Sequence, residues 1–126
     1  MPRLDGGGRL RLAAFQGRAV VLNFWASNCL ACVREWPILD AQAASEPALP
    51  FIGIAIDERR AAQAFLRQHP ASYPQALASA DLLPAFGNQI KGLPYTVIVN
   101  SQHRICTRRL GAIDAAWLSQ ALAACR

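Results

Sequence analysis

Residues 19–32 read AVVLNFWASNCLAC, and this stretch decides the fold. Its first half, residues 19–25, is a nearly continuous apolar run rich in β-forming side chains, which predicts a strand buried on both faces. Two cysteines, Cys29 and Cys32, follow within a few residues. From Cys29 to residue 45 the apolar spacing becomes helical, so we expect the cysteine pair to lie at the start of a helix.

The rest of the chain continues this alternation of strands and helices. Strand patterns, either apolar runs or alternating residues, occur at 8–12, 50–56, 95–99 and 103–109. Helical spacing or helix boundaries occur at 58–68, 79–87 and 115–125. We expect Asp57 to cap the first of these helices and Asp114 to cap the last, because aspartate is a favoured N-cap residue.

The order of these elements predicts an α/β fold with a mixed central β-sheet and helices on both faces. The two main strands joined by a helix should be parallel, with a right-handed crossover between them. The strands at 95–99 and 103–109 should form an antiparallel hairpin at their short turn. No repeat or linker divides the chain, so we predict a single domain over residues 1–126.

The composition is that of a globular protein with a core. Of the 126 residues, 53% are hydrophobic and 17% charged, which argues against disorder. No run reaches the roughly 18 apolar residues of a membrane-spanning helix, and no apolar signal core follows Met1. The net charge is +5, but the arginines are dispersed and accompany no nucleic-acid-binding motif. We therefore expect no nucleic-acid partner and no membrane span in this chain.

The cysteine pair is the chemical centre of the sequence. A helix N-terminus favours an anion, so it lowers the pKa of the Cys29 thiol and makes the thiolate available. Zinc sites use the same spacing, but the other candidate ligands are single residues, and we expect no metal. Those residues are His69, His103, Cys106 and Cys125. For Cys106 and Cys125 we favour two buried free thiols over a second disulfide.

Two distant segments together resemble a known family. Residues 21–32, followed by Glu35 and Pro37, resemble the active-site segment of the thioredoxin superfamily, and of its extracytoplasmic TlpA/ResA/DsbE branch in particular. Residues 91–100, KGLPYTVIVN, resemble the Gly-x-Pro segment of that family. The resemblance implies a thioredoxin-like fold. Two departures concern Asn28, where the family usually has Trp, and residues 30–31, where Pro often precedes the second cysteine.

The resemblance and the chemistry together assign roles to five residues. Cys29 is expected to attack a partner disulfide and Cys32 to resolve the mixed disulfide, so that the pair forms the redox disulfide. Glu35 follows Cys32 by three residues on the same side of the helix and is expected to move its proton, unless it is an ordinary solvent-facing residue. The family implies a cis peptide between Leu93 and Pro94, which would leave the Leu93 backbone free to pair with an extended substrate.

We therefore predict a thiol–disulfide oxidoreductase without a cofactor that acts on protein thiols and disulfides. A reductant, such as one used in cytochrome c maturation, is favoured because no histidine lies between the cysteines and Glu35 would raise thiol pKa values. An upstream protein electron donor and a monomeric state are expected. The family implies a periplasmic or otherwise extracytoplasmic location, with the signal or anchor outside this chain. The alternatives are a Cu(I) metallochaperone using the same thiolates, a thiol peroxidase, and a scaffold that only binds partners.

Overall fold

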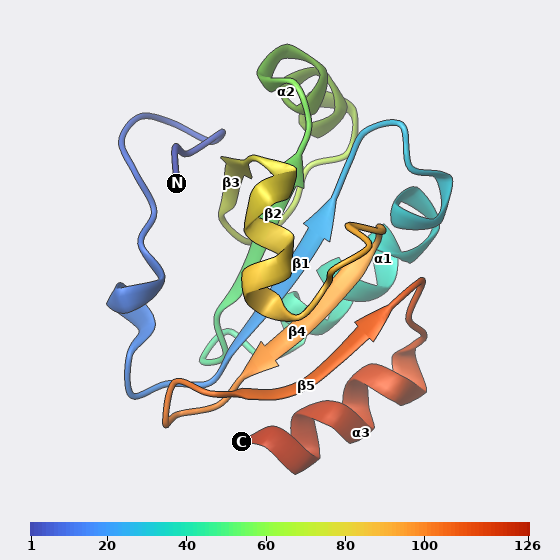
Figure 1. The fold of residues 1–126 in the computed structure, drawn as a ribbon. Coiled ribbons are helices and arrows are strands. Elements are labelled where there is room, and N and C mark those ends of the chain that lie inside the picture. Colours follow the sequence, from blue (N-terminus) through green and yellow to red (C-terminus); the bar gives the residue numbers. More distant parts are fainter.

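The computed structural model describes residues 1–126, and a five-stranded sheet runs through its centre (Figure 1). The strands are β1 (Val20–Trp25), β2 (Phe51–Ile56), β3 (Gln75–Ala78), β4 (Tyr95–Val99) and β5 (Ile105–Leu110). Their order across the sheet is β3-β2-β1-β4-β5. β1, β2 and β3 are parallel, whereas β4 runs antiparallel to both β1 and β5. The prediction of a mixed central sheet is confirmed.

β1 is the central strand, and all six of its residues are buried. Its side chains alternate between two apolar cores. Leu22 and Phe24 enter the core on one face, whereas Val21 enters the core on the opposite face. A strand covered on both faces needs apolar residues at every position, which is why this stretch reads as a continuous apolar run.

The helices are distributed unequally over the two faces. They are α1 (Leu30–Ser45), α2 (Arg59–Gln68), α3 (Ala115–Cys125) and the 3-10 helices η1 (Leu12–Phe15) and η2 (Ala80–Phe86). Leu39 of α1 and Leu118 of α3 pack with Val21, and Phe65 of α2 packs with Trp25, so all three α-helices share one face. The other face is covered by η2, yellow in Figure 1, and by the N-terminal segment. None of these helices is long and apolar enough to span a membrane.

β3 is the strand that the sequence did not reveal. Its residues, QALA, carry neither alternation nor β-branched side chains. The strand forms because β2 offers a free edge on one side, while on the other side the Leu4 amide donates to the Gln75 carbonyl at 2.9 Å. The Gln75 side chain accepts a hydrogen bond from Trp25 Nε1 at 2.9 Å and fills the space above Gly53, where a Cβ atom would collide with it.

Two local predictions were wrong, and one was confirmed. Residues 8–12 form no strand, because only an isolated bridge joins Arg9 to Pro2 before η1 begins. Asp57 is not the N-cap of α2, since the helix begins at Arg59 and Glu58 occupies the cap position. Asp114 caps α3 as expected: its carboxylate accepts a hydrogen bond from the Trp117 amide at 2.7 Å.

The β4–β5 hairpin contains an irregularity that changes where one side chain points. Val99 pairs with Ile105, whereas Ile98 pairs with Thr107, so Cys106 is an extra residue in β5. Such a bulge re-aims the extra side chain relative to the regular alternation of a strand. Here Ile105 and Thr107 both pair with residues of β4, and Cys106 between them forms a disulfide with Cys125 of α3.

Candidate active site

The two cysteines lie where β1 gives way to α1. Cys29 is the N-cap residue of α1, and its Sγ atom accepts a hydrogen bond from the Cys32 amide at 3.2 Å. The two residues form a disulfide with their Cα atoms 5.2 Å apart. Cys32 is buried, whereas Cys29 is partly exposed. Cys29 is therefore the sulfur that a partner can reach, and its position at the helix N-terminus stabilises a thiolate.

The loop before the cysteines is fixed by Asp57, at the end of β2. One carboxylate oxygen of Asp57 accepts a hydrogen bond from the Ser27 amide at 2.8 Å, and the other accepts one from the Glu58 amide at 2.8 Å. The Cys29 amide in turn donates to the Ala26 carbonyl at 3.2 Å. Asp57 thus joins the active-site loop to the neighbouring strand, a function that its predicted role as a helix cap did not include.

Glu35 is buried between three segments of the chain. Its Oε1 atom accepts a hydrogen bond from Asn23 Nδ2 at 3.1 Å, and its Oε2 atom accepts one from the Ile113 amide at 3.1 Å. Asn23 Nδ2 also donates to Thr96 Oγ1 at 3.2 Å. The side chain is only 1% exposed, so the alternative of a solvent-facing residue is wrong.

Burial raises the pKa of Glu35 above its ordinary value. The hydrogen bonds from Ile113 and Asn23 and the positive charge of Arg109 act in the opposite direction, because each favours the ionised carboxylate. Desolvation is the largest of these effects. A carboxyl group with a raised pKa, one helical turn from a buried thiol, can exchange protons closer to neutral pH than an exposed glutamate can.

The peptide bond between Leu93 and Pro94 is cis, as the resemblance implied. Asn88 holds the loop before it, because its side-chain amide donates to the Gly92 carbonyl at 2.7 Å and accepts from the Gly92 amide at 3.3 Å. Leu93 and Cys29 pack against the same apolar cluster, so the loop and the cysteine pair are neighbours. Asn88 is a buried supporting residue that sequence analysis missed, since no motif distinguishes an asparagine in a loop.

Three aromatic rings pack together in the apolar cluster that contains Cys32. The Trp25 ring lies 4.9 Å from that of Trp36 and 5.1 Å from that of Phe65, measured between centroids, and Trp36 and Phe65 are 5.0 Å apart. Cys32 belongs to the same cluster. The rings exclude water from the inner sulfur, so Trp25 is a packing residue of the site.

Cys106 and Cys125 form a second disulfide, so the expectation of two buried free thiols was wrong. Cys106 is exposed on β5, and Cys125 is buried at the last position of α3. The bulge in β5 explains the error, because an alternating strand pattern does not show which way its extra residue points.

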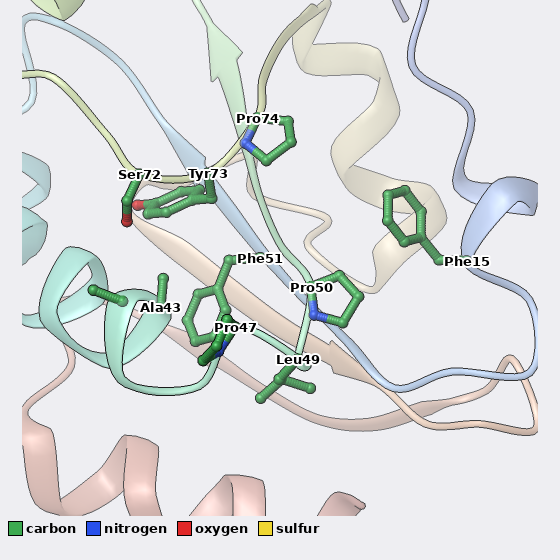
Figure 2. Close-up of a pocket in the computed structure, with 10 residues that line it drawn as sticks. Phe15, Ala43, Pro47, Leu49, Pro50, Phe51, Ser72, Tyr73 and Pro74 are labelled. Carbon is green, nitrogen blue, oxygen red and sulfur yellow. The ribbon is translucent and has the colours of Figure 1, made fainter.

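A pocket of about 270 Å³ lies at the other end of the sheet (Figure 2). Phe51 at the start of β2, Tyr73 before β3 and Phe15 of η1 line it together with several prolines. No cysteine lines this pocket, and it is separate from the redox site. No group of three or more His, Cys, Asp or Glu side chains is arranged so that it could hold a metal ion.

The arrangement of the disulfide at the start of α1, beside a cis-proline loop and on a mixed sheet, defines the chain as a thioredoxin-like protein. More specifically, the chain belongs to the AhpC/TSA family, whose model matches residues 1–110. The predicted fold class and the predicted resemblance to the ResA and DsbE branch are confirmed by the relatives described next.

The chain is similar to curated thiol–disulfide oxidoreductases. It is 26% identical to the thiol-disulfide oxidoreductase ResA of Halalkalibacterium halodurans over 111 residues, which are 85% of this chain and 62% of that protein. It is 26% identical to the thiol:disulfide interchange protein DsbE of Pseudomonas fluorescens over 115 residues, 90% of this chain and 64% of that protein. The chain thus spans less than two thirds of the length of these relatives.

Solved structures share the fold over nearly the whole chain. The structure of MTB DsbF in its mixed oxidised and reduced forms superposes with a TM-score of 0.88 at 26% identity, covering 99% of this chain and 92% of that one. A secreted Mycobacterium tuberculosis disulfide oxidoreductase superposes with a TM-score of 0.81 at 27% identity, covering 98% and 92%. The relatives therefore belong to the class of protein that the cysteine pair predicts.

Proposed function

We propose that this protein is a thiol–disulfide oxidoreductase that acts on cysteines of other proteins. The observation that carries the proposal is the asymmetry of the pair: Cys29 is partly exposed at the N-terminus of α1 and is bonded to the buried Cys32. A nucleophile must reach its partner, whereas a resolving thiol need reach only the first cysteine.

The reaction starts from the dithiol form of the protein. The Cys29 thiolate attacks one sulfur of a client disulfide, so that a bond to this sulfur forms, the client disulfide breaks and the second client sulfur leaves as a thiolate. The Cys32 thiolate then attacks Cys29 Sγ, forms the Cys29–Cys32 bond and releases the first client sulfur. The client gains two electrons and, once its thiolates are protonated, two protons.

Glu35 accepts the proton that Cys32 must lose before it can attack. Its burial, its raised pKa and its place one turn along α1 from Cys32 support this role. Asn23 of β1 donates a hydrogen bond to Glu35, but its amide side chain does not titrate. Of these two side chains, only that of Glu35 can accept the proton. The client segment binds against the loop that contains Leu93 and Pro94. The backbone of Leu93 forms main-chain hydrogen bonds with this extended segment.

The favoured direction is reduction of the client, as in the preparation of cysteines for haem attachment in cytochrome c maturation. A buried anion near the pair disfavours thiolates, and a dithiol with less stabilised thiolates is a better reductant. Each turnover leaves the Cys29–Cys32 disulfide, so an upstream protein dithiol must reduce it again. We expect the protein to act as a monomer.

An extracytoplasmic location is supported by the second disulfide, because stable structural disulfides are typical of oxidising compartments. A similar structure is that of a secreted disulfide oxidoreductase. The periplasm is the proposed location.

The proposed function is tested with a peptide that carries an oxidised Cys-x-x-Cys-His sequence, the attachment motif of c-type haem. The dithiol form should reduce this peptide, and the Cys32→Ser variant should accumulate a mixed disulfide through Cys29. The Cys29→Ser variant is the matched control and should form none. Stoichiometric Cu(I) binding or peroxide consumption without any disulfide exchange would contradict the proposal and support one of the alternatives.

A further inference from the structure

A shallow pocket of about 360 Å³ lies between the connection from η2 to β4 and the edge strand β5. We call it the β5 pocket. Its walls include Asn88, Ile90, Tyr95, Arg108 and Leu110. Leu110, the last residue of β5, pairs with Tyr95, the first residue of β4, and Tyr95 directly follows Pro94. The pocket therefore lies at the end of the sheet that carries the redox site.

Two large apolar side chains stand in solvent at the rim of this pocket. Ile90 is 77% exposed and Leu110 is 47% exposed. Both flank Gly92, because a Cβ atom at that glycine would lie 2.9 Å from Leu110 Cδ1 and 3.7 Å from Ile90 Cδ1. Exposed apolar groups gathered at one place indicate a contact surface, and here they border the residue next to Leu93.

The pocket is held in shape before anything binds. The side chain of Asn88 makes hydrogen bonds to both backbone groups of Gly92, and the Tyr95 hydroxyl donates to the Phe86 carbonyl at 2.6 Å. These bonds fix the loop at both ends of the pocket. A partner therefore meets a formed surface and loses little free energy in ordering it.

Arg108 supplies an uncompensated positive charge to this surface. Its guanidinium lies over Gly87, where a Cβ atom would collide with Nη1, and it makes no hydrogen bond or ion pair with any residue. The two neighbouring cationic side chains already have partners. Lys91 forms an ion pair with Asp81 at 2.9 Å. Arg109 lies over the Trp117 ring on the opposite face of the sheet. The β5 pocket thus combines an apolar rim with one free cation.

We propose that the β5 pocket binds an extended client segment that carries a carboxylate side chain next to an apolar one. The carboxylate pairs with Arg108, and the apolar side chain covers Ile90 and Leu110. Extended chain advances about 3.3 Å per residue, so a carboxylate placed two to four residues from the client cysteine lies about 7 to 13 Å from it along the chain. This inference rests on the proposed function and adds a sequence preference to it.

The test measures second-order rates with which the dithiol protein reduces peptides whose single cysteine carries a glutathione mixed disulfide. The peptides differ only in having Glu, Gln or Lys next to a Leu, placed two to four residues before or after the cysteine. At low ionic strength the Glu peptide should react about two- to fivefold faster than the Gln peptide, the range expected for an exposed ion pair. The Lys peptide should be the slowest, and added salt should reduce the differences.

Three variants separate the pocket from the net charge of the protein. Arg108→Gln should abolish the preference for Glu, whereas Arg104→Gln should retain it, since Arg104 lies in the turn at the other end of the strand. Ile90→Ser should slow all peptides that carry Leu, and it should fold normally because the side chain is largely exposed. Reaction with dithiothreitol should be unchanged in all three.

The outcomes distinguish the two proposals. Equal rates for the Glu, Gln and Lys peptides, or loss of the preference in Arg104→Gln as well, would overturn the assignment of the β5 pocket and leave the oxidoreductase activity standing. Failure of the native dithiol to reduce any peptide, although dithiothreitol exchanges with it, would overturn the proposed function itself.

Discussion

At the scale of single residues, Glu35 is a carboxyl group held in an environment very different from water. It is almost completely buried, and only two donors, on Asn23 and Ile113, compensate for the lost water. Ile113 lies 78 positions along the chain, so this contact depends on the docking of α3. The chemistry proposed for Cys32 thus depends on a carboxyl group that the whole fold positions.

The raised pKa of Glu35 predicts a pH-dependent stability with a definite sign. The folded state holds the proton more tightly than the unfolded state, so the stability is highest below the ordinary glutamate pKa and falls as pH rises through the raised folded pKa. Urea unfolding between pH 4 and 8 measures this. The free energy of unfolding of the native protein, relative to Glu35→Gln, should decrease with pH. A constant or increasing difference would contradict the assigned direction.

The same variant tests the role of Glu35 in proton movement. In Glu35→Gln the attack of Cys29 on a peptide disulfide should be nearly unchanged, because that step needs only the outer thiolate. Resolution by Cys32 should slow by about 100-fold, the lower end of the range for general base catalysis, and lose its dependence on the Glu35 ionisation. Rapid-quench detection of the mixed disulfide separates the two steps. An unchanged resolution rate and pH profile would show that Glu35 is only structural.

At the scale of elements, α3 is held at both ends. Asp114 caps its first turn, and Cys125 at its last position is bonded to Cys106 of β5. The Ile113 amide that binds Glu35 immediately precedes this helix. The second disulfide therefore stabilises an element that also completes the active site.

Removing that disulfide should lower stability without removing the redox reaction. The cross-link closes a loop of about 20 residues, for which the chain-entropy relation gives about 3 kcal/mol. Urea unfolding of the Cys106→Ala, Cys125→Ala variant should show a loss of this size, while the Cys29–Cys32 pair still exchanges with dithiothreitol. An unchanged unfolding free energy would mean that packing of Leu118 and Leu122 alone holds α3.

The tight contact between β2 and β3 gives a second test at this scale. Gly53 lies directly beneath the Gln75 side chain, so Gly53→Ala must displace that amide and break its bond to Trp25 Nε1. We expect a loss of about 2 kcal/mol, the sum of an overpacking cost and a lost buried hydrogen bond. Thermal unfolding measures it. As a matched control, Gly7→Ala should change little, because that exposed glycine has open space around it.

At the scale of the whole molecule, the sequence predicted what local patterns determine and missed what distant partners determine. β1 and α1 follow from a continuous apolar run that changes to helical spacing at Cys29. β3 has no pattern of its own, and it forms because β2 and the N-terminal segment pair with it. A pattern read one segment at a time cannot show such an element.

In the candidate site, too, some features could be predicted from the sequence and others could not. The cysteine pair is visible from its spacing, and the cis peptide before Pro94 was expected from the resemblance alone. The donors that surround Glu35, the Asn88 bonds to the loop and the bond between Cys106 and Cys125 were not predicted, because each joins residues whose proximity is created by the fold.

The central claim is that Cys29 and Cys32 exchange reversibly while the rest of the molecule stays folded. The direct measurement is a titration with reduced and oxidised dithiothreitol, in which thiol labelling and mass spectrometry identify the cysteines that open. The account predicts one two-electron step at the Cys29–Cys32 pair, with Cys106–Cys125 intact because that bond joins α3 to β5 in the folded protein. A Cys29–Cys32 pair that stays oxidised or reduced across the whole range, or opens only when the protein unfolds, would contradict it.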